Sequence, residues 1–275
     1  MGTLLDKILR PGSLAPLFQP IFKVYGQEKE LHSLECLMRG PAGTSVERAE
    51  ILFGYVRRKR EEIAVDRACM RAALQAAAKL PYEPRISVNV HASTLGRDVG
   101  FVGYLKGLAD QWGIDSQRLT VELIEHAPAW DVAGMWRAIN ELRAYGMRLA
   151  VDDVGAGQSN YNMILDCCSD ALKVDAYVVR GCHADTHRVA VLESITTLAR
   201  RFGAQIIAEG IEQASDLTTL LGMGINLIQG YMLARPMTAE ALIESGLLFK
   251  GGTPPIAGGP QAKIRSHHGI ARSDG

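Results

Sequence analysis

RLTVELIEHAPAWDVAGMWRAINELRAYGMRLAVDDV, at residues 118–154, contains a strand pattern, a helix pattern and a second strand pattern in a row. Residues 118–125 and 147–154 are short runs rich in apolar and β-branched side chains, which indicates two buried strands. Residues 133–146 have apolar side chains at helical spacing and end on Gly146, a common helix stop. A strand, a helix and a strand in this order form the repeating unit of parallel sheets that are covered by helices.

The same alternation extends along the chain and gives eight candidate strands, at 17–25, 31–38, 85–92, 118–125, 147–154, 171–179, 204–210 and 226–233. Eight such units in 275 residues predict an α/β fold of the closed-barrel type. Only GQEKE, at 26–30, joins the first two strands, and five residues are too few for a parallel crossover. The sequence therefore predicts a modified (β/α)8 TIM-like barrel with an antiparallel first strand. An open doubly wound sheet is the competing fold, but the glycine-rich phosphate loop that it needs is missing.

The composition of the chain indicates where its domain begins and ends and which classes of partner are unfavourable. We expect residues 1–13 to lead into a barrel domain at 14–249, and the Gly- and Pro-rich residues 250–275 to be disordered. Thirty basic residues balance thirty acidic ones, which argues against a nucleic-acid polymer or an anionic membrane as the partner. No apolar run is long enough for a membrane span or a signal peptide. Five cysteines without metal-ligand spacing indicate free thiols, so the cytoplasm is the expected location.

Polar side chains stand where the apolar runs of successive strands stop, and this is the face of a barrel on which active sites are built. They are Glu35, Asn89, Glu122, Glu125, Asp152, Asp153, Lys173, Asp175, Glu209, Glu212 and Gln229. Any one of them could simply face water, but converging carboxylates repel one another unless cations lie between them. Oxygen ligands favour magnesium, manganese or calcium. In the Asp152–Asp153 pair, one carboxylate can bridge two metals while its neighbour binds one, and Lys173 can supply positive charge near a phosphate.

Eight short segments stand in a characteristic order along the chain: FQPIF (18–22), LECLMRG (34–40), SVNVHASTL (87–95), VELIEHAP (121–128), VDDVGAGQSNY (151–161), LKVD (172–175), AEGIE (208–212) and QGYMLARP (229–236). In this order they resemble the motifs of the EAL domain family, the cyclic di-GMP phosphodiesterase barrels of bacteria. The resemblance covers about residues 14 to 247. Cys36 stands where the family name has its alanine.

The resemblance implies a ligand set and a reaction. Glu35, Asn89, Glu122 and Asp152 would hold one Mg²⁺ or Mn²⁺ ion, and Asp152 would bridge to a second ion held also by Asp153 and Glu209. Glu125 would support a mobile loop. Lys173, Glu209 and Glu125 would act in catalysis, and Gln19, Arg39 and Gln229 would contact the substrate. The expected reaction converts cyclic di-GMP to linear pGpG through a water activated by both metals, and a homodimer is a candidate assembly.

The loop after the paired aspartates departs from the family pattern. Val154, Ala156 and Gln158 replace a usual phenylalanine, a frequent threonine and a usual tyrosine. One alternative is therefore a weak or inactive EAL domain that serves as a cyclic di-GMP receptor or a protein-interaction module. Another is a barrel hydrolase for a different phosphate ester. The complete set of expected metal ligands favours the phosphodiesterase.

Overall fold

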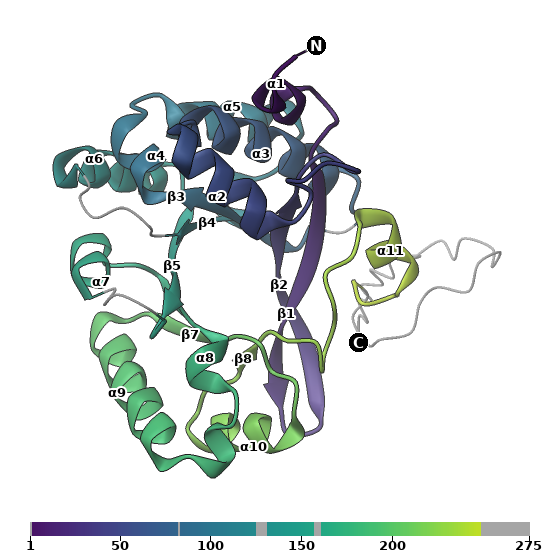
Figure 1. Ribbon diagram of the computed structural model, residues 1–275. Coiled ribbons are helices and arrows are strands. Elements are labelled where there is room, and N and C mark those ends of the chain that lie inside the picture. Colours follow the sequence, from purple (N-terminus) through teal and green to yellow (C-terminus); the bar gives the residue numbers. More distant parts are fainter. Residues whose placement is uncertain (1, 82, 125–130, 157–160, 249–275) are drawn as a thin grey trace, which may run out of the picture.

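A computed structural model describes residues 2–81, 83–124, 131–156 and 161–248 of this chain. Its eight strands close into a barrel in sequence order, β1 to β8 (Figure 1). The strands are β1 Ala15–Tyr25, β2 Glu28–Arg39, β3 Arg85–His91, β4 Leu119–Ile124, β5 Arg148–Val154, β6 Ala171–Val174, β7 Gln205–Ala208 and β8 Leu227–Ile228. The predicted TIM-like barrel is confirmed.

Helices connect the strands and cover the outside of the barrel (Figure 1). The α-helices are α1 Leu4–Leu9, α2 Ala49–Lys59, α3 Glu62–Ala77, α4 Ala92–Arg97, α5 Phe101–Gln111, α6 Val132–Ala144, α7 Tyr161–Cys167, α8 Ala176–Val179, α9 Thr186–Phe202, α10 Ala214–Gly222 and α11 Ala239–Glu244. Short 3-10 turns lie at Ser116–Arg118 and Cys182–Ala184. No helix in the described ranges is long and apolar enough to cross a membrane.

The first strand runs antiparallel to β2, as predicted, and it also runs antiparallel to β8. β1 pairs with β2 over its whole length, from Ala15 opposite Arg39 to Tyr25 opposite Glu28. Its other edge pairs with β8 through Phe22 and Lys23, which closes the barrel. The turn between β1 and β2 holds only two residues, and Gly26 there has a φ of 60°, a left-handed conformation that glycine adopts without strain. The other neighbouring pairs are parallel.

Small and branched apolar side chains form a cluster separate from the main core, on strands β1, β5, β6, β7 and β8. Its members are Ile21, Ala150, Ala171, Ile207 and Leu227. On β5, β6 and β7, each member stands two residues before a carboxylate or an ammonium of the candidate site. Because side chains two residues apart on a strand face the same way, this apolar cluster lies beneath the polar groups and supports them.

Two of the predicted strands extend too far. The prediction of a strand at 171–179 is wrong beyond Val174, because Asp175 begins helix α8 instead. The Asp175 carboxylate accepts a hydrogen bond from the backbone N–H of Tyr177 at 2.7 Å, which caps the helix. The last strand is also shorter than predicted and holds only Leu227 and Ile228. The predicted tail at 250–275 lies outside the described residues.

Candidate active site

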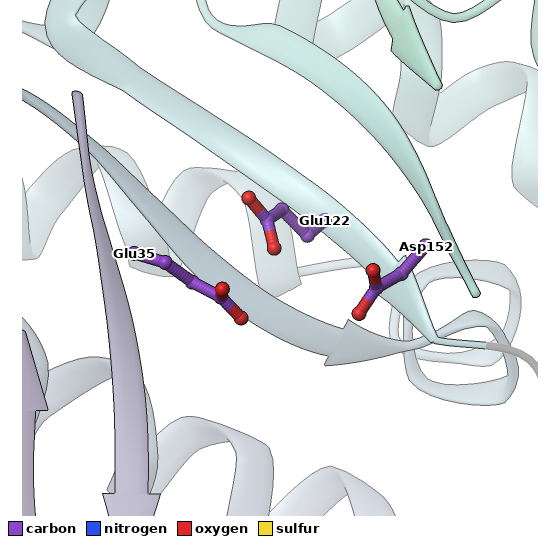
Figure 2. A group of neighbouring side chains, drawn as sticks. All are labelled: Glu35, Glu122 and Asp152. Atoms are coloured by element: carbon purple, nitrogen blue, oxygen red, sulfur yellow. The ribbon is translucent and has the colours of Figure 1, made fainter. Parts of the chain in front are cut away.

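Carboxylates from neighbouring strands meet at one end of the barrel. Glu35 on β2, Glu122 on β4 and Asp152 on β5 each place a carboxylate oxygen within 4.8 Å of the others (Figure 2). Asp152, Asp153 and Glu209 form a second group by the same measure. The two groups share Asp152, which is the arrangement needed for two cations bridged by one carboxylate.

Both aspartates reach the site because β5 is irregular there. Neighbouring residues on a regular strand face opposite sides, so a regular β5 would turn one of the two away. Instead, the pairing of β5 with β6 shifts register between Val151 and Val154, and Asp153 takes a left-handed φ of 54°. Aspartate tolerates this conformation better than most residues. The bulge therefore lets two adjacent carboxylates serve one site.

A buried ammonium lies among these carboxylates. Lys173, on β6, is 1% exposed, and its Nζ lies 2.6 Å from Glu209 Oε1 and 2.7 Å from Glu122 Oε2. The same atom lies 3.1 Å from Asp152 Oδ1 and 3.2 Å from Glu35 Oε2. One cation thus contacts four carboxylates, and the acidic charge of the site still exceeds the basic charge.

The excess negative charge and the burial of the site raise the pKa values of most of its carboxyl groups. Burial, opposed by Lys173, raises the pKa of Glu122 to about 8. Burial, assisted by the neighbouring Asp152 carboxylate, raises the pKa of Asp153 to about 6. Burial also raises the pKa values of Asp152 and Glu209. These are the shifts expected of carboxylates that gather where cationic charge is insufficient.

Glu35 is the exception, because two amides hold it in its charged form. Burial works to raise its pKa, but Lys173 and the two amides lower it below its usual value. Asn89 Nδ2 donates to Glu35 Oε1 at 2.8 Å, and Gln229 Nε2 donates to Glu35 Oε2 at 2.7 Å. The carbonyl oxygens of both amides are buried and have no hydrogen-bond donor among the described residues. These two free acceptors and the surrounding carboxylates make an all-oxygen ligand set that fits a hard divalent cation.

A cavity of about 300 Å³ opens beside the two carboxylate groups. Its lining includes Gln19, Glu35, Asp152, Lys173, Arg180, Glu209, Glu212, Gln229 and Tyr231. Gln19 donates to the carbonyl oxygen of Ala234 at 3.2 Å, so its amide is held in place at the cavity wall. Arg39, at the end of β2, donates to the carbonyl oxygen of Met38 at 3.3 Å and does not line this cavity. Glu125 lies outside the described residues.

Arg180 and Tyr231 also line this cavity, although the sequence motifs do not predict either residue to be part of the site. Arg180 follows α8 and forms an ion pair of 2.7 Å with Glu212 at the cavity wall. It was missed because residues 171–179 were predicted to be a single strand. Tyr231 follows the Gln229–Gly230 turn. A Cβ atom on Gly230 would lie only 2.1 Å from the carbonyl oxygen of Ile211, so this close approach requires glycine.

The altered loop after the paired aspartates is described only in part. Val154 is 4% exposed and belongs to the hydrophobic core, so its side chain packs inside the protein rather than facing the cavity. Gln158 lies outside the described residues.

The raised pKa of Glu122 predicts how stability depends on pH without metal. Because the native carboxyl keeps a proton that the unfolded chain releases, wild-type stability falls as the pH rises from about 4.5 to about 8. The glutamine of Glu122→Gln cannot ionise. The difference in the free energy of unfolding, variant minus wild type, should therefore increase as the pH rises across this window. Its slope should be at most about 1.4 kcal/mol per pH unit. Urea unfolding of chelator-treated protein between pH 5 and pH 8 measures it, and parallel profiles for the two proteins would contradict the assignment.

Comparison with known proteins gives consistent matches. The family model described as EAL domain matches residues 3–236. The cyclic di-GMP phosphodiesterase PdeL of Escherichia coli is 29% identical over 174 residues, 63% of this chain and 48% of PdeL. The c-di-GMP-bound form of a standalone versatile EAL protein from Vibrio cholerae O395 superposes with a TM-score of 0.71 at 26% identity, over 82% of this chain and 93% of that one.

A manganese and cyclic di-GMP complex of Klebsiella pneumoniae BlrP1 also superposes with a TM-score of 0.71 at 26% identity. That match covers 84% of this chain and 58% of the other. The chain spans less than half of the length of the curated relatives it matches, and about 30% of several of them.

Proposed function

Because this chain belongs to the EAL domain family, we propose that it is a metal-dependent phosphodiesterase that hydrolyses cyclic di-GMP to linear pGpG. The observation that carries the proposal is the pair of carboxylate groups that share Asp152 beside a cavity of about 300 Å³. The name of PdeL and the ligands of the Vibrio and Klebsiella structures support it.

We propose that two Mg²⁺ or Mn²⁺ ions are the cofactors. Glu35, Asn89, Glu122 and Asp152 would hold one ion, and Asp152, Asp153 and Glu209 would hold the other. The charges support this number: the five carboxylates of the two groups match two divalent cations and one ammonium. When bound, such ions lower the pKa of a water molecule and neutralise charge that develops on the phosphate.

The other residues of the site would position the reacting groups. Lys173 holds the carboxylates of Glu122 and Glu209 at 2.7 Å and 2.6 Å, so it fixes ligands from two different strands. Asn89 and Gln229 orient Glu35 from opposite sides through its two oxygens. We assign contacts with the substrate to Gln19, Gln229 and Arg39, because an amide can donate to a phosphate oxygen and a guanidinium can pair with it. Glu125 is assigned to the support of a loop next to the site.

The proposal is tested by chromatography of purified protein incubated with cyclic di-GMP. We expect pGpG to form with Mg²⁺ or Mn²⁺ and not after chelation. Calcium serves as an inhibitory control, because Ca²⁺ takes oxygen ligands in a larger and more flexible geometry than Mg²⁺. Binding of cyclic di-GMP without any product would instead identify a receptor. Turnover of other phosphodiesters but not of cyclic di-GMP would identify a different hydrolase.

A further inference from the structure

A second, smaller cavity lies inside the barrel, beneath the candidate metal ligands, and reaches one of them, Glu122. Its volume is about 30 Å³, enough for one small ion or two water molecules. Its lining combines four members of the apolar cluster, Ile21, Ala150, Ala171 and Ile207, with the polar residues His32, Ser33, Arg85, Ser87, Thr120, Glu122, Arg148, Asp170 and Gln205.

The register of the strands brings two arginines to this cavity. Arg85 is four residues before Asn89 on β3, and Arg148 is four residues before Asp152 on β5. Because side chains at even spacing on a strand share a face, both arginines point to the same interior as the candidate site, one barrel layer below the apolar cluster. Thr120 of β4 is paired with Arg148 and lies between the two strands. Strands β3 and β5 are therefore about 10 Å apart, a separation that two arginine side chains can span.

The two guanidinium groups have no acidic partner in the part of the chain that the structure describes. Neither Arg85 nor Arg148 forms an ion pair or a side-chain hydrogen bond there, whereas Arg67, Arg180 and Arg188 each pair with a carboxylate. Their mutual repulsion is evident: burial and the charge of Arg148 lower the pKa of Arg85. Burial and the charges of both arginines also lower the pKa of His32. The two guanidinium groups therefore carry positive charges that no carboxylate of the described residues pairs with directly, and Glu30 opposes their effect on the pKa of His32.

The two acidic side chains at the cavity are directed to other partners. Asp170 Oδ2 accepts the backbone N–H of Leu149 at 2.9 Å. Glu122 Oε2 accepts from Lys173 at 2.7 Å, on the side of the candidate active site. Neither carboxylate lies within 4.0 Å of a guanidinium nitrogen of Arg85 or Arg148 among the described residues. The positive charge at the cavity thus stays available to a ligand.

A buried hydroxyl completes the donor set. Ser87, on β3 between Arg85 and Asn89, is 3% exposed, and its Oγ has no hydrogen-bond partner among the described residues. A buried polar group without a partner is unfavourable, by about 1–3 kcal/mol, so such groups are usually satisfied by a water molecule or an ion. Ser33 differs, because its hydroxyl lies 3.1 Å from Nδ1 of His32.

We propose that this cavity binds one small inorganic anion, such as chloride or phosphate, between Arg85, Arg148 and the hydroxyl of Ser87. The anion neutralises two guanidinium groups and satisfies one buried donor. The site is distinct from the candidate metal centre, because Arg85, Ser87 and Arg148 stand two to four residues before the candidate ligands on β3 and β5, and Glu122 is the one candidate ligand among the residues that line the cavity. The volume of about 30 Å³ limits the ligand to a single small ion.

Thermal unfolding of chelator-treated protein tests the proposal. Chloride is titrated against gluconate at constant ionic strength, since gluconate is too large for the cavity. Inorganic phosphate forms a second arm, which distinguishes the two ion types. We expect a saturating rise in Tm of about 3–5 °C at ten times the dissociation constant. The combined Arg85→Gln and Arg148→Gln variant, and Arg148→Gln alone, should lose this rise, and Ser87→Ala should weaken it.

A control variant separates the site from other basic surfaces. Arg201→Gln removes an exposed arginine of α9 with no pairing partner among the described residues. It should keep the full anion-dependent rise in Tm. The readout is the change caused by the anion, so it is independent of any shift in the baseline stability of a variant. Absence of a saturating rise in the wild type, or an equal rise in Arg148→Gln, would overturn the proposal.

Discussion

Replacing Glu35 with glutamine is expected to abolish the hydrolysis of cyclic di-GMP. Glu35 is 4% exposed, belongs to one of the two carboxylate groups and accepts from the amides of Asn89 and Gln229. Glutamine keeps the size of the side chain but removes its charge and one acceptor oxygen, so this cation site loses a charged ligand. The expected fall in kcat exceeds the ~10²–10³-fold that follows the loss of one preorganised electrostatic contact.

The same substitution should also lower the free energy of unfolding of the metal-free protein. The neutral amide loses the attraction of Lys173 that holds the pKa of Glu35 below its usual value, and its single oxygen cannot accept from both Asn89 and Gln229. Glu240→Gln is the matched control, because Glu240 is an exposed carboxylate that forms an ion pair of 3.0 Å with the exposed Lys79. It should leave both kcat and metal affinity unchanged. Near-normal turnover by Glu35→Gln would show that the site has been assigned to the wrong residues.

Replacing Lys173 with methionine is expected to produce the largest loss of stability in the metal-free protein. The ammonium is 1% exposed and lies within 3.2 Å of four carboxylates, so its removal leaves their negative charges buried without a counter-charge. Removing one partner of a buried ion pair destabilises a protein by about 3–5 kcal/mol, because the other charge stays buried without a counter-charge. The loss should shrink at acidic pH, where the carboxyl groups take up protons and no longer repel.

Lys79→Met provides the matched comparison for Lys173→Met. Lys79 forms an ion pair of 3.0 Å with Glu240, and both side chains are more than half exposed. Exposed pairs contribute about 0–1 kcal/mol, so this variant should unfold almost as the wild type does. Urea unfolding with and without Mg²⁺ checks both variants, and Mg²⁺ should restore much of the stability lost in Lys173→Met. An equal, small loss in the two variants would mean that the carboxylates do not depend on Lys173.

The sequence predicts the barrel and its antiparallel first strand well, because both follow from local properties. The number of apolar runs indicates eight strands, and the five-residue link at 26–30 excludes a parallel crossover. The positions of Glu35 and Glu122 also follow, since each stands where an apolar run ends and the strands of a barrel share one open face.

Other features depend on contacts that are distant in sequence. Asp153 reaches the site through a bulge in the pairing of β5 with β6, and no local pattern in VDDV specifies that bulge. Helix α8 replaces the end of a predicted strand because Asp175 caps it, although Ala176–Val179 is apolar enough for either structure. The cavity at Arg85 and Arg148 forms through the parallel register of β3, β4 and β5, and no local sequence pattern predicts that register.

The closure of the barrel by β1 and β8 has a consequence for the synthesis of this protein. β1 pairs with β2 through a two-residue turn, so this hairpin can form soon after it leaves the ribosome, but the other edge of β1 must wait for Leu227 and Ile228. At about 5–20 residues per second, translation takes roughly 10–40 s to cover that distance. During this interval an open strand edge can pair with other nascent chains. The slow step of maturation is therefore expected to be closure of the barrel, and chaperones should act on this protein before β8 is complete.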